Sequence, residues 1–169
     1  MSVKIVVLCG GLSPERNVSL SSGGRIALAL RSLGHRAALV DMYLGLEDMD
    51  VDLEAAFDAP LPDTSRAAES EPDLDAVRAG RRLKGGSLFG EGVLEICAAA
   101  DVVFLALHGQ CGEDGRVQAA FDLMGIRYTG SGYLASALAM DKSLAKALVS
   151  AQGVPPPDWG FYRRGEGVQ

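Results

Sequence analysis

The segment Lys4-Ile-Val-Val-Leu8, followed at once by Cys9-Gly10-Gly11, sets the class of fold that the rest of the chain has to match. A continuous apolar run bounded by glycines is typical of a parallel strand that is covered on both faces. After the turn, apolar residues recur mostly at helical spacing until Gly34, which stands where a helix C-cap would, and Arg36–Val40 supplies a second strand. Such a strand-helix-strand unit, normally right-handed, predicts an α/β fold with a doubly wound, mainly parallel sheet and helices on both faces.

The hydrophobic pattern is interrupted in the middle of the chain and then resumes. Between Tyr43 and Gly92 the periodicity fades and prolines interrupt it, which predicts a largely irregular, acidic surface insertion over about 44–92, with one short helix near Asp50–Phe57. The elements expected after the insertion are helices at Glu91–Ala99, at Val117–Met124, from Tyr133 and at Asp141–Ala151, and strands at Asp101–Leu107 and Ile126–Thr129. We therefore expect one α/β domain over residues 1–140 and the start of an incomplete second domain over residues 141–169.

Length and charge limit the classes of function. The 169 residues, 48% of them hydrophobic, suit one globular domain with a single core. The net charge is -6, but the segment Leu44–Gly80 holds 11 of the 22 acidic and only 2 of the 16 basic residues, a local balance of -9 that leaves +3 elsewhere. This distribution argues against general nucleic-acid binding. Because no apolar run reaches the roughly 18 residues of a membrane span, we expect no membrane partner either.

The cysteines point to neither a disulfide framework nor a zinc site. Cys9, Cys97 and Cys111 are odd in number and share no C-x-x-C spacing, so a reducing cytoplasm is the setting that we expect. Cys111 with His108 would offer a thiol and a base. An i, i+3 pair on a glycine-rich loop does not fix the geometry of a nucleophile and its base, and no third orienting group is evident, so we disfavour this interpretation.

The loop after the first strand is the first candidate for a site, because open α/β sheets bind ligands outside the carboxyl ends of their strands. Gly10-Gly11 lets the backbone pass close to a ligand, and Ser13 would cap a helix whose N-terminus favours an anionic group. Neither G-x-G-x-x-G nor G-x-x-x-x-G-K-[ST] is present, which disfavours a dinucleotide-binding oxidoreductase and P-loop binding. Glu15 is either a favourable first-turn helix charge or the group that receives the ammonium of a small substrate.

Two further motifs lie downstream. His108-Gly-Gln-Cys-Gly-Glu-Asp-Gly115 follows another apolar strand, and its glycines predict a tight loop at the same edge of the sheet. His108 donates or accepts there near neutral pH, or is a strand-end residue satisfied by backbone. Tyr128-Thr-Gly-Ser-Gly132 precedes Lys142, which stands near a helix start and would need Asp141 or a bound phosphate to offset its charge. A solvated surface lysine is the alternative.

Taken together, three segments resemble the D-alanine-D-alanine ligase family of the ATP-grasp superfamily. They are Gly10–Leu20, His108–Gly115 with Gln118, and Tyr128–Gly132 continued through Ser136-Ala137 to Met140-Asp-Lys142. The resemblance rests on their order and spacing, covers both ends of the chain, and leaves the insertion unaligned. It implies a Rossmann-like domain of the kind that precedes an ATP-grasp domain.

The resemblance also implies an activity: an ATP-dependent ligase of bacterial peptidoglycan synthesis that joins two D-alanines through D-alanyl phosphate, with Mg2+ (or Mn2+) on the phosphates. Carried onto the matching positions, it implies that Glu15 binds the ammonium of the first D-alanine and serves catalysis. Val18 would contact that substrate, His108 would help to hold it, and Lys142 would reach the ATP phosphates. It gives no metal ligand in this chain.

Several alternatives stay open. The family's adenine pocket, second phosphate-binding lysine and acidic Mg2+ ligands have no counterpart here, so we expect this chain alone to show no measurable turnover. A resistance-type ligase that joins D-alanine to D-lactate or D-serine is one alternative, and a non-catalytic small-molecule-binding fragment is another. A homodimer is the assembly that we consider for such a chain.

Overall fold

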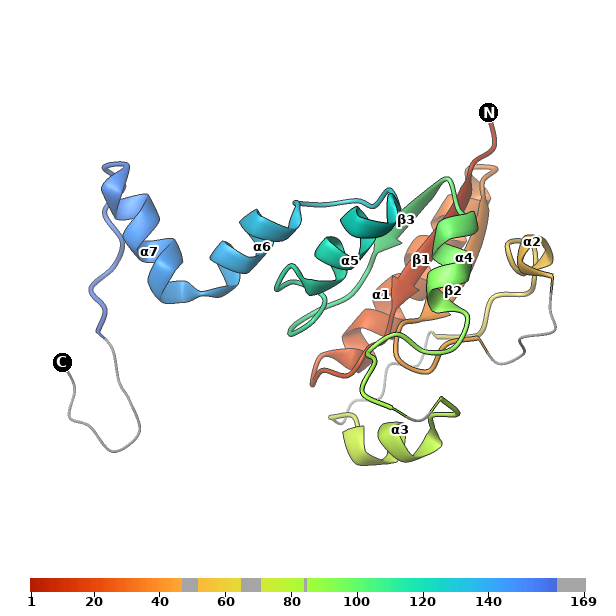
Figure 1. The fold of residues 1–169 in the computed structure, drawn as a ribbon. Coiled ribbons are helices and arrows are strands. Elements are labelled where there is room, and N and C mark those ends of the chain that lie inside the picture. The colour runs from red at the N-terminus through yellow and green to blue at the C-terminus, as the bar shows by residue number, and fades with distance from the viewer. Residues whose placement is uncertain (47–51, 65–70, 84, 161–169) are drawn as a thin grey trace.

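The computed structural model describes residues 1–46, 52–64, 71–83 and 85–160 (Figure 1). Its elements in chain order are β1 (Lys4–Cys9), α1 (Arg16–Ser32), β2 (Arg36–Asp41), α2 (Leu53–Ala56), α3 (Leu74–Gly80), α4 (Val93–Ala99), β3 (Val102–Leu105), α5 (Arg116–Met124), α6 (Tyr133–Met140) and α7 (Lys142–Ala151).

The strand β1 lies at the centre of the sheet. The strands pair in the order β2-β1-β3, and both pairs are parallel. Ile5 therefore aligns with Ala37 on one side and with Val102 on the other. Residues Val6–Leu8 of β1 are 0% exposed, as a strand covered on both faces should be.

Alternate residues of β1 face two separate apolar cores. On one face, Leu8 belongs to a core that includes Ile96 of α4 and Phe121 of α5. On the other face, Val7 packs in a core with Ala27 of α1. Helices therefore cover both faces of a parallel sheet, which confirms the predicted doubly wound α/β fold.

The strand expected at Ile126–Thr129 is reduced to a single bridge beside β3. Tyr128 bridges Val103 in the parallel direction. The ladder goes no further because the next amide, Leu105 N, donates at 3.2 Å to the hydroxyl of Thr129 rather than to a backbone carbonyl. A side chain has taken the place of the next ladder bond.

The helix α3 is an element that the hydrophobic pattern does not predict. Its seven residues include only two large apolar side chains, Leu74 and Val77, which are too few to show a helical period, and none of the seven is buried. Its first turn is held by Asp73, whose carboxylate accepts from the amides of Asp75 and Ala76. Arg78 pairs with Asp75 one turn later. Capping and side-chain pairing stabilise this helix where burial does not.

Residues 52–64 form a segment that we call the strap. It contains α2, which confirms a short helix within the expected range Asp50–Phe57, although residues 50 and 51 lie outside the described part of the chain. The strap runs beside β2 (Figure 1) and reaches both cores. Phe57 is fully buried in the core that includes α4, and Leu61 packs against the core that includes α1.

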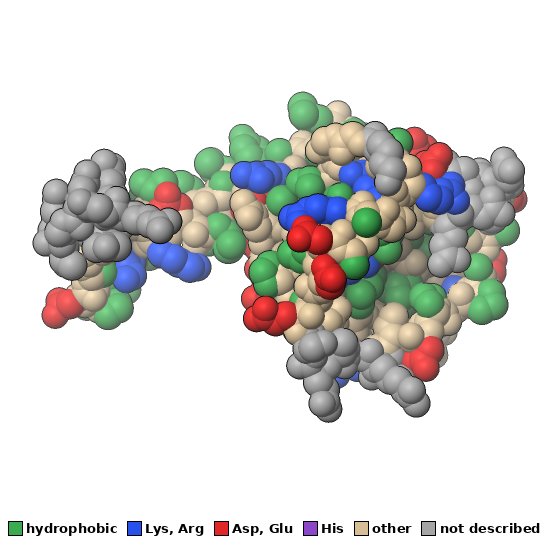
Figure 2. All heavy atoms as spheres, turned by 90° about the horizontal axis from the view of Figure 1, so that it is seen from below, with side chains coloured by type: hydrophobic (Ala, Val, Ile, Leu, Met, Phe, Trp, Pro, Cys, Tyr) green, Lys and Arg blue, Asp and Glu red, His purple; other side chains and the backbone are tan. Residues whose placement is uncertain are grey.

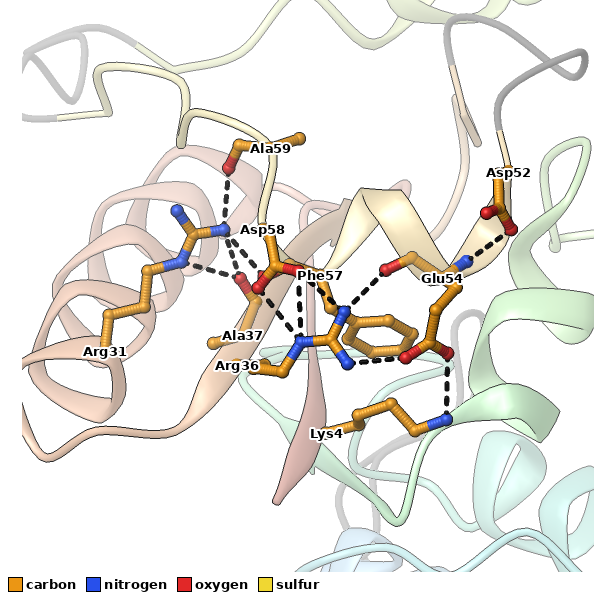
Figure 3. A network of polar contacts seen from close by, with 9 residues as sticks. All are labelled: Lys4, Arg31, Arg36, Ala37, Asp52, Glu54, Phe57, Asp58 and Ala59. Atoms are coloured by element: carbon orange, nitrogen blue, oxygen red, sulfur yellow. Dashed lines mark hydrogen bonds and ion pairs between the residues drawn. The ribbon is translucent and has the colours of Figure 1, made fainter. Parts of the chain in front are cut away.

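Two arginines hold the strap against the sheet (Figure 3). Arg31 of α1 donates to three carbonyl oxygens, those of Ala37 in β2 and of Phe57 and Ala59 in the strap. Arg36, the first residue of β2, pairs with Asp58 at 2.6 Å and also with Glu54. This part of the insertion is therefore fixed to the domain by specific contacts and is not an irregular surface loop.

The helices α6 and α7 extend away from the sheet (Figure 1), and we call residues 133–151 the arm. The helix α6 contacts α5 on one side and α7 on the other. Hydrophobic side chains gather along the arm at the left of Figure 2, and the large exposed ones are Tyr133, Leu134, Met140, Leu144, Leu148 and Val149. In the described ranges, the arm included, no helix is long and apolar enough to cross a membrane.

Candidate functional site

A buried serine of α1 joins the carboxyl ends of β1 and β3. The hydroxyl of Ser19 donates to Ala106 O at 2.6 Å and accepts from Gly10 N at 2.9 Å. Ser19 is 0% exposed, so water does not compete for these hydrogen bonds. The loop that begins at Gly10 and the loop His108–Gly115, which we call the second loop, were expected at one edge of the sheet, and they lie side by side.

A second serine joins the two loops more directly. Ser13 Oγ donates to His108 O at 2.8 Å and accepts from Glu15 N at 3.2 Å. The expectation that Ser13 caps α1 is wrong, because Glu15 occupies the N-cap position and no side chain caps the helix there. The hydroxyl of Ser13 is instead engaged with the second loop and with the amide of Glu15.

The carboxylate of Glu15 lies against the second loop at a glycine. A Cβ atom on Gly109 would stand 3.2 Å from Glu15 Oε2 and 3.3 Å from Ser13 Oγ, closer than ordinary van der Waals contact. Gly109 also has φ +73°, which favours glycine on its own account. Glu15 itself is exposed. A ligand at the surface can therefore reach a carboxylate that the second loop approaches closely.

His108 and Val18 lie at the same end of α1. His108 Nε2 is 3.3 Å from Ser22 Oγ, and Ser22 Oγ donates to Val18 O at 2.8 Å. Val18 is 58% exposed. The structure thus brings together three of the expected site residues, and we call Glu15, Val18 and His108 the Glu15–His108 site. Ser19 and Ser22 follow Glu15 at i+4 and i+7 on one side of α1, and this helical spacing is the sequence signal that would have found them.

The second loop is braced by its own acidic residues. Glu113 Oε2 accepts from Gly109 N at 2.7 Å, and Asp114 Oδ2 accepts from Cys111 N at 3.0 Å. Asp114 also accepts from Arg116 N at the start of α5, as a helix-start charge does. These bonds hold Cys111 at φ +73°, which is uncommon for a residue other than glycine.

The three cysteines are not arranged for thiol chemistry. Cys111 Sγ is approached by Arg116 Nη1 at 3.7 Å, whereas His108 faces Ser22, so the disfavoured thiol–base pair is not formed. Burial raises the pKa of the Cys9 and Cys97 thiols to about 12. Both therefore stay protonated at neutral pH. Among the described residues, no group of three or more His, Cys, Asp or Glu side chains is placed to hold a metal ion.

Sequence reasoning missed a buried ion pair next to the site. Arg16 is 5% exposed, pairs with Asp41 at the end of β2, and donates to Gly11 O at 2.7 Å. An arginine in the first turn of a helix gives no sign that it is buried. Asp41 lies 25 residues away, so no local spacing connects the two.

Lys142 is not brought to the Glu15–His108 site. It is exposed on the arm, at the first residue of α7, and its Nζ donates to Ala139 O at 3.1 Å. Asp141 caps the helix by accepting from the amides of Ser143 and Leu144. The expected acidic partner at this helix start is therefore present, and a phosphate contact stays a prediction.

A cavity of about 640 Å³ lies between the sheet and the strap. Its walls are mostly apolar and come from β2, α1, α4 and the strap, with Cys9 and Asp41 among the lining residues. Neither Glu15 nor His108 lines this cavity. We therefore do not place the small substrate there.

Comparison with known proteins identifies relatives along nearly the whole chain. A family model described as the D-ala D-ala ligase N-terminus matches residues 4–131. Similar curated proteins include the D-alanine-D-alanine ligases of Lacticaseibacillus casei, 43% identical over 169 residues, and of Pediococcus pentosaceus, 44% identical over 171 residues. Each alignment covers 98% of this chain but only 46% and 48% of the relatives. The chain thus spans about half the length of the curated relatives it matches.

Solved structures share the fold. The D-alanine-D-alanine ligase of Bacillus anthracis complexed with ATP has a TM-score of 0.64 and 24% identity, with 99% of this chain and 42% of that chain covered. The ligase of Coxiella burnetii has a TM-score of 0.63 and 24% identity, with 98% and 46% covered. At this level of identity the likeness bears on the fold alone.

Proposed function

The chain belongs to the D-alanine-D-alanine ligase family, whose N-terminal part it matches, and from this we propose that the Glu15–His108 site binds the first D-alanine of a ligase reaction. The observation that carries the proposal is the exposed Glu15 carboxylate, which lies against Gly109, the residue that follows His108. D-Alanine carries its ammonium and its carboxylate on the same carbon atom, so the two charges lie close together. Glu15 pairs with the ammonium, while His108 and the N-terminal turn of α1 receive the carboxylate. Val18 contacts the substrate.

In the proposed reaction, ATP transfers its γ-phosphoryl group to the carboxylate of this D-alanine, giving D-alanyl phosphate and ADP. The amine of a second D-alanine attacks the acyl carbon and loses a proton, and inorganic phosphate leaves with the electron pair of the broken C–O bond. We place this reaction in the cytoplasm, in the synthesis of peptidoglycan precursors for the cell wall.

Lys142 is our candidate for contact with the ATP phosphates. A phosphate at the start of α7 would offset the charge of a lysine that stands at the positive end of the helix dipole. The proposal requires the arm to bring Lys142 toward the Glu15–His108 site. Mg2+, or Mn2+, would neutralise the phosphates, but no acidic cluster among the described residues fits it. We therefore assign its ligands to the half of the relatives that this chain does not span.

We propose that the chain alone binds D-alanine without turning it over, because phosphoryl transfer depends on positioning groups that the Glu15–His108 site does not include. The purified chain with ATP, Mg2+ and D-alanine should release no phosphate above a protein-free control. D-Alanine-dependent phosphate release would contradict this.

We also propose that the chain forms a homodimer. Light scattering tests this proposal, and a monomeric mass would contradict it.

The test of the site is a D-alanine titration followed by NMR of the 15N-labelled chain, with Glu15→Gln as the variant. Loss of a charge-assisted hydrogen bond, roughly 1.5–3 kcal/mol, should weaken binding about tenfold or more. Glu95→Gln is the matched control, because Glu95 is an exposed first-turn acid of α4. If Glu15 were only a favourable helix charge, both variants would bind D-alanine like the unaltered chain.

A further inference from the structure

Arg16 follows Glu15 in the chain, yet the two side chains have opposite environments. Glu15 is exposed, whereas the side chain of Arg16 is only 6% exposed. Arg16 Nη1 donates to Gly11 O at 2.7 Å and to Asp41 Oδ1 at 3.2 Å, and Nη2 pairs with Asp41 Oδ2. The guanidinium thus holds the glycine-rich loop to the end of β2.

Asp41 is itself fixed by the turn that follows β2. Its Oδ1 accepts from Tyr43 N at 2.9 Å and from Leu44 N at 3.0 Å. On its other side the carboxylate lies against Gly10, where an added methyl group would overlap it. Asp41 therefore presents a carboxylate of fixed orientation to Arg16.

We propose that Arg16 and Asp41 are a positioning pair for Glu15, an inference that rests on the proposed D-alanine site. The loop is fastened on two sides: Ser13 attaches it to the second loop and Ser19 to the residue after β3, while Arg16 attaches it to β2. Glu15 lies between Ser13 and Arg16, so its backbone is fixed before the ligand arrives. Because the loop is ordered in the free protein, the binding free energy does not have to offset a cost of ordering it.

The pair also keeps a cation away from Glu15. A free Arg16 guanidinium is a neighbour that could occupy the carboxylate meant for the substrate's ammonium. With Asp41 as its partner, Arg16 is neutralised on the side of β2, and the carboxylate of Glu15 stays open to the ligand. A lysine cannot replace Arg16, because one ammonium does not match the planar fork that meets Gly11 O and both Asp41 oxygens.

The experiment compares D-alanine titrations of the unaltered chain with those of Arg16→Lys and Asp41→Asn. The matched control is Arg36→Lys, which alters an arginine–carboxylate pairing at the opposite end of the same strand. We expect both test variants to weaken binding at least tenfold and the control to change it less than twofold. If Arg16→Lys unfolds, the isosteric Asp41→Asn variant decides. Test variants that bind like the control, while Glu15→Gln does not bind, would overturn the inference and leave the proposed function standing.

If the unaltered chain does not bind D-alanine, the proposed function is overturned. The positioning role of Arg16 and Asp41 is then tested by a measurement that needs no ligand. The nuclear Overhauser effect between the Glu15 side chain and the Gly109 α protons reports the position of Glu15. It should be present in the unaltered chain and in Arg36→Lys and absent in Arg16→Lys and Asp41→Asn. Its persistence in the folded test variants would overturn the positioning role.

Discussion

Replacing Gly109 by alanine tests whether the contact between Glu15 and the second loop matters for binding. The substitution has two separable effects. A side chain at φ +73° costs about 1–2 kcal/mol of folding free energy. The new methyl carbon would also lie 3.2 Å from Glu15 Oε2 and 3.3 Å from Ser13 Oγ, against an ordinary contact of 3.4–4 Å, so these two side chains must move by a few tenths of an ångström.

Gly125→Ala isolates the first effect. Gly125, at the C-cap of α5, has φ +67°, and a Cβ atom there would meet nothing within 4 Å. Urea unfolding should therefore show a similar loss of stability in both variants, about 1–2 kcal/mol. D-Alanine titration should separate them, with binding weakened about tenfold, or roughly 1.4 kcal/mol, in Gly109→Ala alone. Equal affinities in the two variants would refute the reasoning that places Glu15 in the site through Gly109.

Two further outcomes follow from the strap and the thiols. Hydrogen bonds from Arg36 lower the pKa of Glu54 and Asp58 below the ordinary values of 4.5 and 3.8. The two carboxylates therefore contribute fully to stability above their ordinary pKa values, and this contribution is lost as the pH falls through the lowered pKa values of the folded state. The urea midpoint of the unaltered chain should drop more steeply than that of Arg36→Ala below about pH 4, and parallel curves would contradict this. Burial raises the pKa of the Cys9 and Cys97 thiols to about 12. Only Cys111 should therefore react with a thiol reagent in the native state at pH 8. Fast labelling of all three thiols would contradict this prediction.

The sequence predicts well those parts of the molecule that depend on local pattern. The apolar run from Lys4 and the helical spacing after Gly11 are sufficient for β1 and α1, because burial on two faces and amphipathic periodicity leave a direct trace in residue order. The meeting of Glu15 and His108 follows from a rule of topology, since parallel strands bring their carboxyl ends to one edge.

The remainder depends on contacts between residues that no local pattern connects. Nothing near Arg16 marks it as buried, and its partner Asp41 is known only once β2 lies beside β1. The helix α3 is held by a cap and an ion pair and has only two large apolar residues among its seven, so hydrophobic periodicity does not reveal it. The place of Lys142 depends on the direction in which the arm leaves the sheet, and spacing in the sequence does not give that direction.

The central position of β1 has a consequence for the order in which the protein folds. Its pairing with β2 closes a short loop, whereas its pairing with β3 joins residues that are 97 positions apart, as Ile5 and Val102 are. Closing the longer loop costs more chain entropy, and contacts of high sequence separation form slowly. During synthesis β1, α1 and β2 leave the ribosome before β3 does, so the partner for one edge of β1 is available before the partner for the other. Since Glu15 comes from the early unit and Gly109 from beyond the late strand, their contact reports that the last strand has docked.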